Sequence, residues 1–100
     1  MKTAVVTGAA QGVGLVTSAL LGRLGYEVIL TDLQPLDEQV SRLTAEGLKV
    51  HGVVGDVSSE GFAKDLAARI AKDYGAADVL VNNAGISLIC AAEDTTLAQW

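Results

Sequence analysis

The sequence has few of the residues that mark several large classes of protein. It contains one cysteine, so no internal disulfide can form and no oxidising compartment is implied. Aromatic residues make up 4% of the chain, and no apolar run is long enough to cross a membrane. The seven Lys and Arg residues are scattered and the net charge is −5, which excludes the clustered basic surface of a nucleic-acid-binding protein. We expect a cytoplasmic protein without nucleic-acid or membrane partners.

Small and aliphatic residues are abundant instead. Half of the residues are hydrophobic and 11 are glycine, a mixture that suits a parallel sheet covered by helices on both faces. A chain of 100 residues amounts to one small domain or to part of a larger one.

Hydrophobic periodicity predicts that strands and helices alternate. Short buried strands are expected at 2–6, 27–31, 48–54 and 78–81. Helices are expected between Gly12 and Gly25, between Pro35 and Gly47, and between Ser58 or Ser59 and Gly75. A capping-box pattern at 96–99 opens a further helix. Short connections between alternating elements mean right-handed crossovers. The predicted class is α/β: the first half of a doubly wound, Rossmann-like parallel sheet with the order β-α-β-α-β-α-β.

The expected helices differ in their apolar positions. In the first, Val13, Val16, Leu20, Leu21 and Leu24 recur at helical spacing. The second has a core face of Leu36, Val40 and Leu43, and the third an apolar stripe of Phe62, Leu66, Ile70 and Tyr74.

The stretch Thr7-Gly8-Ala9-Ala10-Gln11-Gly12-Val13-Gly14 joins the first strand to the first helix. Its spacing, T-G-x-x-x-G-x-G, departs from G-x-G-x-x-G because Thr17 stands where the last glycine would fall. In such a turn one glycine permits the sharp bend, another lets the backbone approach a pyrophosphate, and another lets the helix pack closely. The unpaired N–H groups at the helix start then face the phosphate charge. A P-loop is excluded, because no Gly-Lys-Ser/Thr follows.

Asp32 ends the second strand, roughly 20 residues beyond the glycine turn. A carboxylate at that place can accept both hydroxyls of an adenosine ribose; the alternative is an aspartate that only forms a turn or caps a helix. The same carboxylate repels a ribose 2′-phosphate. Gln11 places no cation beside the turn, so NAD is the predicted cofactor rather than NADP.

The glycine turn, Asp56-Val57 and Asn82-Asn83-Ala84-Gly85, in this order and spacing, closely resemble the short-chain dehydrogenase/reductase family. The similarity covers the whole chain, and the Asn-Asn-Ala-Gly run is its most specific part. It implies an NAD(H)-dependent oxidoreductase that moves a hydride between a small-molecule secondary alcohol or ketone and nicotinamide, as a homodimer or homotetramer. The implied cofactor-binding residues are Gly8, Gln11, Gly12, Val13, Gly14, Asp32, Leu33, Asp56, Val57, Asn83, Ala84 and Gly85.

By the same resemblance, the backbone from Gly8 to Val13 holds the pyrophosphate, and Asp56 with Val57 holds the adenine edge. The run from Asn83 to Gly85 lines the adenosine ribose. Asn82 is expected to brace the sheet more than to bind a ligand.

Catalytic residues of the family are not found in these 100 residues. The family's chemistry uses a Tyr-x-x-x-Lys pair and a serine. Neither Tyr26 nor Tyr74 has a lysine four positions later in the chain, and Ser87 is not at the family's catalytic serine position. His51 lies inside the third expected strand, where a packed or rim imidazole is expected rather than a general base. We therefore predict no catalytic residue and no metal site in 1–100, and place the catalytic portion beyond residue 100.

Two alternatives stay open. One is a non-catalytic dinucleotide-binding module that senses or regulates. The other is a methyltransferase, which also places an acid after its second strand, although the asparagine run and the glycine spacing speak against it. Reading the chain beyond Trp100 for a Tyr-x-x-x-Lys pair would separate the enzyme from the non-catalytic module.

Overall fold

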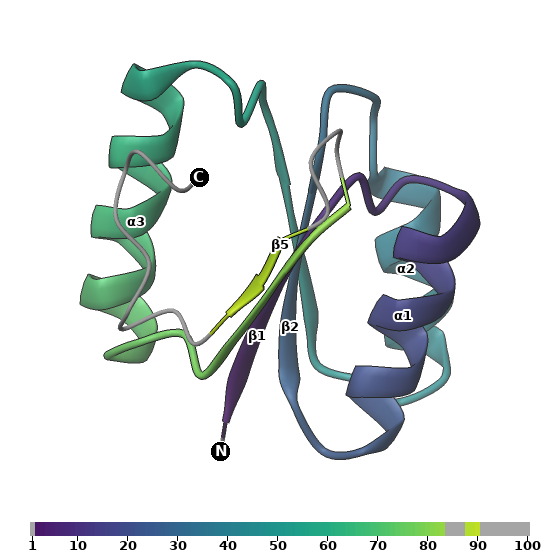
Figure 1. Cartoon of the computed structure of the whole chain (residues 1–100). Helices are drawn as coiled ribbons and strands as arrows, with labels where there is room; N and C mark the ends of the chain where they lie inside the picture. Colours follow the sequence, from purple (N-terminus) through teal and green to yellow (C-terminus); the bar gives the residue numbers. More distant parts are fainter. Residues whose placement is uncertain (1, 84–87, 91–100) are drawn as a thin grey trace.

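A computed structural model describes residues 2–83 and 88–90 of the chain. Its strands are β1 (Thr3–Thr7), β2 (Glu27–Asp32), β3 (Val50–Val54), β4 (Val79–Asn82) and β5 (Leu88–Cys90). Its helices are α1 (Gly12–Arg23), α2 (Asp37–Ala45) and α3 (Glu60–Tyr74). Helices α1 and α2 cover one face of the sheet and α3 covers the other (Figure 1). The helix expected at 96–99 lies outside the described residues.

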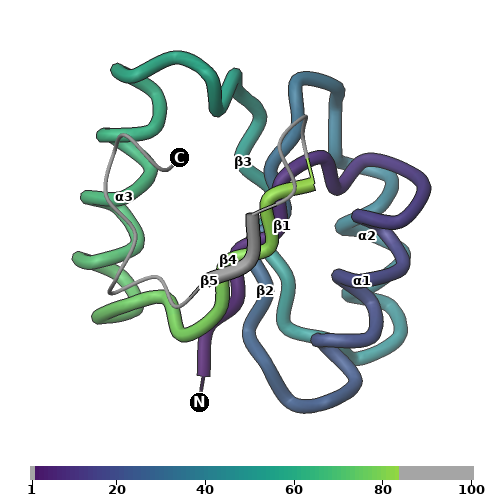
Figure 2. Tube along the Cα trace, viewed as in Figure 1, coloured from purple at the N-terminus to yellow at the C-terminus, as the bar shows by residue number. Residues whose placement is uncertain are grey.

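The strands form one sheet in the order β3-β2-β1-β4-β5. Strand β1 pairs in parallel with β2 and with β4, so Val5 stands opposite both Ile29 and Leu80. Strand β3 pairs in parallel with β2, while the short β5, which the sequence did not predict, runs antiparallel to β4. The chain moves outward from β1 to β3 and then returns to β4 on the other side of β1 (Figure 2). This reversal of strand order is where α/β sheets of this kind bind ligands, at the carboxyl ends of the strands.

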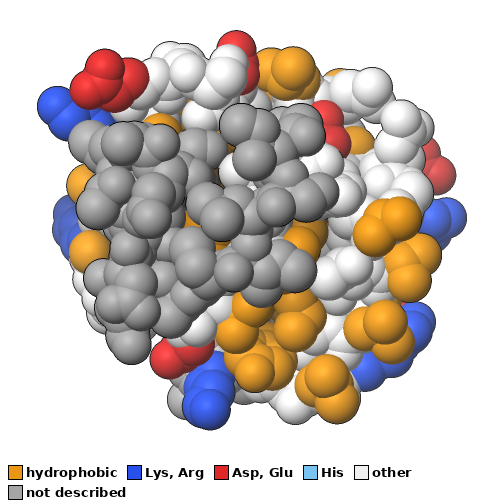
Figure 3. All heavy atoms as spheres, in the orientation of Figure 1, with side chains coloured by type: hydrophobic (Ala, Val, Ile, Leu, Met, Phe, Trp, Pro, Cys, Tyr) orange, Lys and Arg blue, Asp and Glu red, His pale blue; other side chains and the backbone are white. Residues whose placement is uncertain are grey.

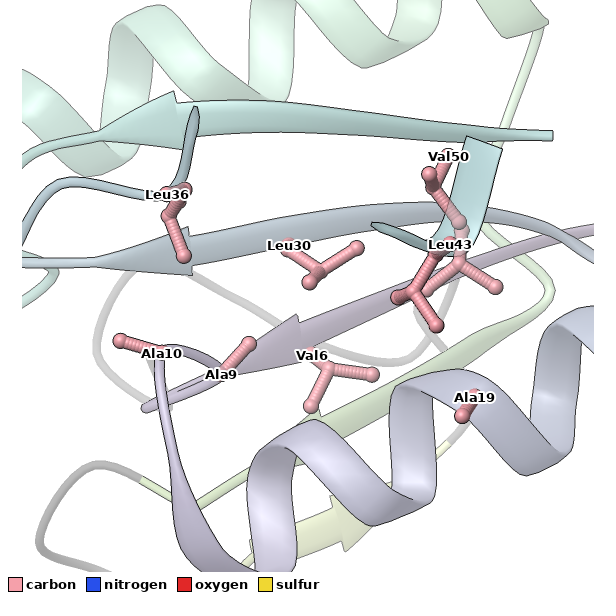
Figure 4. Close-up of a cluster of buried hydrophobic side chains, with 9 residues drawn as sticks. Val6, Ala9, Ala10, Ala19, Leu30, Leu36, Leu43 and Val50 are labelled. Carbon is pink, nitrogen blue, oxygen red and sulfur yellow. The ribbon is translucent and has the colours of Figure 1, made fainter. Parts of the chain in front are cut away.

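Successive residues of the central strands point to opposite faces of the sheet and supply two cores. Val6 and Leu30 pack under α1 and α2, and Val5 and Ile29 pack under α3. The labelled side chains of the first core come from both strands and helices of that face (Figure 4). Strands β1 and β2 are therefore buried on two sides, which explains their nearly continuous apolar sequences. Strand β3 was also expected to be buried, but it lies at the edge of the sheet and most of its residues are exposed.

Helix α1 turns small residues toward the sheet. Its buried residues are Gly14, Ser18, Ala19 and Gly22. Four of the apolar positions that predicted the helix are exposed instead: Val13 by 71%, Val16 by 59%, Leu20 by 52% and Leu24 by 76%. Hydrophobic side chains are visible at the surface on the side of the molecule occupied by α1 and α2 (Figure 3). The predicted helix is confirmed, but its large apolar residues are not its buried face.

Helices α2 and α3 follow the sequence pattern more closely. Leu66 and Ile70 of α3 are buried, and the Ser59 hydroxyl accepts the N–H of Phe62 at 3.4 Å as an N-cap. Leu43 is the buried anchor of α2. That helix begins two residues after Pro35 rather than at it, because the preceding residues form a turn held by the Asp32 carboxylate.

Candidate cofactor-binding site

The carboxyl ends of β1, β2 and β3 border a cleft of about 320 Å³. Its lining residues are Gly8, Thr31, Asp32, Leu33, Gly55, Asp56, Val57 and Ser58. The structure therefore brings together five of the residues predicted from the sequence, from three separate strand ends. Gln11, Gly12 and Val13 are exposed at the start of α1. Ala84 and Gly85 lie outside the described residues.

The glycines of the turn occupy three different environments. Gly8 and Gly12 have positive φ angles of 62° and 61°, which other residues rarely adopt. A Cβ on Gly12 would meet no atom within 4 Å, so the backbone there is open to a ligand. A Cβ on Gly14 would lie 2.1 Å from the carbonyl oxygen of Gly8 and is impossible without movement of the backbone. Gly14 is thus the position that lets α1 lie against the turn.

The N-terminus of α1 has no side-chain cap. Gln11 stands at the N-cap position in an extended conformation, its side chain makes no capping hydrogen bond, and the first turn contains no acidic residue. The first N–H groups of a helix have no partner within the helix and carry its positive partial charge. An exposed, uncapped helix start with an open glycine backbone fits a phosphate group.

Asp32 is already engaged by the backbone on both carboxylate oxygens. Oδ2 accepts the N–H of Ala10 at 2.9 Å, and Oδ1 accepts the N–H of Gln34 at 3.0 Å. The turn role that the sequence left open is therefore present. A carboxylate has about four acceptor positions, so each oxygen keeps capacity for a ribose hydroxyl.

Asp56 follows β3 and is exposed at the cleft. Its Oδ1 accepts both the hydroxyl of Ser58 at 2.6 Å and the N–H of Ser58 at 2.9 Å. These two hydrogen bonds, the hydroxyl first, lower the pKa of Asp56 below its ordinary value, against a smaller opposing effect of desolvation. The carboxylate is thus held ionised, and within the described residues its Oδ2 makes no hydrogen bond.

Thr7 ties the ends of β1 and β4 together. Its hydroxyl donates to Oδ1 of the buried Asn82 at 2.9 Å and accepts the N–H of Asn83 at 2.8 Å. The expected bracing role of Asn82 is confirmed. The side-chain nitrogen of Asn83 would lie 3.0 Å from a Cβ on Gly14, so Asn83 packs against the start of α1.

Gln39 contacts the glycine turn, although the sequence analysis did not single it out. Its side-chain amide donates to the carbonyl of Ala10 at 2.8 Å. A signal was present: Gln39 stands three residues after Leu36 and four before Leu43, on the apolar face of α2, where a polar residue needs a partner.

His51 lies apart from the cleft-lining residues and packs as expected. Its Nε2 lies 2.6 Å from Oε2 of Glu27, and its ring meets that of Tyr74 with centroids 5.6 Å apart. Burial raises the pKa of Tyr74, with smaller contributions from Glu27 and Asp73 that Arg69 opposes. Within the described residues no cluster of His, Cys, Asp and Glu could hold a metal ion. None of the described helices has the length and apolar character needed to span a membrane.

Comparison with known proteins places this geometry in a family. The sequence profile of short chain dehydrogenases matches residues 2–100. The chain belongs to the short-chain dehydrogenase family. The family's members are oxidoreductases that bind a nicotinamide dinucleotide and act on small molecules, which excludes the methyltransferase alternative.

Two curated relatives illustrate the similarity within the family. Gluconate 5-dehydrogenase of Gluconobacter oxydans is 39% identical over 97% of this chain and 39% of its own length. D-beta-hydroxybutyrate dehydrogenase of Rhizobium meliloti is 30% identical over 99% of this chain and 40% of its own length. The chain thus spans about two fifths of these relatives.

Solved structures agree with the family assignment. A metagenomic short-chain oxidoreductase in complex with NADP superposes with a TM-score of 0.78 and is 36% identical, covering 85% of this chain and 39% of that protein. The citronellol catabolism dehydrogenase of Pseudomonas aeruginosa has a TM-score of 0.80 and 33% identity, covering 86% of this chain and 37% of that protein. The predicted Rossmann-like fold and the predicted family are confirmed.

Proposed function

We propose that this chain is the NAD(H)-binding part of an oxidoreductase that transfers a hydride reversibly between a secondary alcohol or ketone and nicotinamide. The observation that carries the proposal is the uncapped N-terminus of α1, opened by Gly12, beside the Asp32 cleft. When bound, the nicotinamide supplies or accepts the hydride.

Each part of the cofactor has a proposed holder. The backbone from Gly8 to Val13 binds the pyrophosphate through helix N–H groups, and Gly14 lets α1 begin close to Gly8. Asp32 accepts ribose hydroxyls beside Leu33, and Asp56 with Val57 binds the adenine edge. Asn83, Ala84 and Gly85 line the adenosine ribose. We place the groups that donate and accept the proton beyond residue 100, and we propose a cytoplasmic homodimer or homotetramer.

The preference for NAD over NADP rests on the charges of the cleft. Asp32 and Asp56 both line it, and none of the described lining residues is a lysine or an arginine. Two unit charges about 4 Å apart at an effective dielectric near 20 interact by ~4 kcal/mol. Water and rearrangement reduce that repulsion, and a preference of about 100-fold, or ~2.7 kcal/mol, remains. A relative of the same fold binds NADP, so the proposed preference for NAD rests on the side chains of this cleft and not on the fold.

The phosphate part of the proposal is tested by titrating the full-length protein with NADH and following its fluorescence. Gly12→Val places a branched side chain where the pyrophosphate must approach, and we expect the dissociation constant to rise at least about tenfold. Gly25→Val is the matched control, since Gly25 also has a positive φ, of 97°, and open space around it, but lies beyond the other end of α1. Equal affinities in the wild type and the Gly12 variant would contradict the phosphate site.

The choice of cofactor is tested by the ratio of the NAD and NADP dissociation constants. Asp32→Ser, and more strongly Asp32→Ser with Gln11→Arg, should move this ratio toward NADP, because the repulsion is removed and a cation is added. An unchanged ratio would leave Asp32 with its turn role alone. A full-length protein that binds NADH but oxidises none of a panel of secondary alcohols would favour the non-catalytic module.

A further inference from the structure

The two alanines that follow Gly8 in the turn, Ala9 and Ala10, are held by hydrogen bonds from several sides. The N–H of Ala9 donates to the carbonyl of Thr31 at 3.2 Å, and the N–H of Ala10 donates to Asp32 at 2.9 Å. The carbonyl of Ala10 accepts the amide of Gln39 at 2.8 Å. Both alanines are buried. Their hydrogen bonds connect this segment to the end of β2 and to α2.

The contact with Gln39 determines the direction of a peptide plane. No peptide bond in the described residues is cis. In a planar trans peptide the C=O and the following N–H point in opposite directions. Because the carbonyl of Ala10 points to Gln39, the N–H of Gln11 points away from α2, at the beginning of the helix terminus that lacks a cap.

The core contacts that hold α2 on the sheet come from residues other than Gln39. The buried anchors of that helix and its preceding turn are Leu36 and Leu43, which both belong to the core, whereas Gln39 is half-buried and outside it. Its described contact is with the glycine turn. A glutamine there pairs a neutral donor with a carbonyl and adds no negative charge beside a phosphate.

We propose that Gln39 is a positioning residue for the pyrophosphate of the dinucleotide, acting through the carbonyl of Ala10. This inference rests on the proposed function. It assigns to α2, none of whose residues lines the Asp32 cleft, the task of orienting the first N–H groups of α1. Loss of the contact allows the peptide plane to rotate, so affinity falls for ligands that carry the pyrophosphate and stays the same for adenosine.

The test uses the full-length protein with three ligands: NADH, ADP and adenosine. Gln39→Met keeps the length of the side chain and removes the hydrogen bond, and Ser41→Met places the same side chain at an exposed position of α2 as a control. We expect dissociation constants for NADH and ADP to rise about five- to tenfold in Gln39→Met, the factor typical of one hydrogen bond. The adenosine constant, measured by NMR titration, should stay within twofold, and Ser41→Met should match the wild type for all three ligands.

The outcomes separate the inference from the proposed function. A wild type that binds neither NADH nor ADP overturns the proposed function and the inference with it. If the wild type binds both and Gln39→Met binds them equally well, or loses adenosine in the same proportion, Gln39 has no positioning role. If Gln39→Met melts at a lower temperature than the wild type, Gln39→Ala is measured in the same way. A rise in the ratio of the ADP to the adenosine dissociation constant in either variant supports the positioning role, and an unchanged ratio in both contradicts it.

Discussion

Helices α1 and α3 lie on opposite faces of one sheet and contact it with different kinds of side chain. Helix α1 presents Gly14, Ser18, Ala19 and Gly22 to the strands, while α3 presents Ala63, Leu66 and Ile70. The large aliphatic residues of α1 lie mostly at the surface, and those of α3 lie mostly in the core.

The start of each helix explains the difference. Helix α1 begins inside the glycine turn, where Gly14 touches the carbonyl of Gly8, and that contact holds its first turn close to the end of β1. Small residues fill the narrow space between such a helix and the sheet. Helix α3 follows a longer connection, stands farther off, and has Ser59 as a cap. The difference fits the role that we propose for α1, which lies close to the sheet with an uncapped N-terminus, whereas α3 packs through bulky side chains and has a capped N-terminus.

The largest expected effect comes from adding one methyl group to a glycine of each helix. Gly14→Ala places a Cβ against the backbone of Gly8, and we expect the free energy of unfolding to fall by at least about 3 kcal/mol. Gly61→Ala in α3 meets no atom closer than 3.9 Å and should stabilise the helix by about 0.5–1 kcal/mol. Urea denaturation of both variants measures the difference. Equal stabilities would mean that α1 does not depend on close contact with the turn.

Removing a leucine from each helix gives the next largest difference. Leu66→Ala empties a buried site of α3 and should cost about 2–3 kcal/mol, whereas Leu20→Ala in α1 should cost less than about 1 kcal/mol. The same denaturation experiment compares them. A loss of more than about 2 kcal/mol for Leu20→Ala would show that parts of the molecule outside the described residues cover α1.

Buried hydroxyl groups provide a smaller contrast. Ser18 of α1 donates to the carbonyl of Gly14 at 2.8 Å, while the fully buried Oγ1 of Thr31 has no hydrogen-bond partner in the described part of the chain. Replacing an unpaired polar group by an apolar one of equal shape is favourable, so Thr31→Val should raise the free energy of unfolding by about 1 kcal/mol. Ser18→Ala should lower it by about 1 kcal/mol or less. Destabilisation by Thr31→Val would indicate that this hydroxyl has a partner beyond the described residues.

The smallest expected effect on stability concerns Asp56, the carboxylate that precedes α3. Ser58→Ala removes the hydroxyl donor, so the pKa of Asp56 should rise toward its ordinary value, as an NMR titration of the carboxyl carbon would show. A lowered folded-state pKa stabilises the protein above the unfolded pKa, and this contribution disappears as the pH falls through the folded pKa. Ser58→Ala should therefore be less stable than the wild type at pH 7, by a margin that shrinks in acid. The control is Ser59→Ala, which removes the neutral N-cap of α3. Its loss of stability relative to the wild type should not change with pH over the range in which Asp56 titrates.

Most of the secondary structure could be predicted, because buried parallel strands and helix stop signals are local patterns. Gly25, Gly47 and Gly75 each have a positive φ and follow a helix, as their positions indicated. The strand β5 was missed because a three-residue strand has no pattern of its own. The buried face of α1 was missed for a different reason: its large apolar residues are regularly spaced, and the distance of the helix from the sheet depends on contacts between Gly14 and Gly8.

The candidate site divides in the same way. The residues at the carboxyl ends of the strands could be predicted, since strand order and chain direction follow from the alternation of elements and the glycine turn. The hydrogen bonds from both Asp32 oxygens to backbone N–H groups, and the bond from Gln39 to the carbonyl of Ala10, became visible only in the folded chain. The contacts of Ala10 with Asp32 and with Gln39 join residues that are 22 and 29 positions apart in the chain and share no local pattern. Hydrogen bonds of this kind depend on the positions of the helices on the sheet, and those positions result from the packing of the whole core.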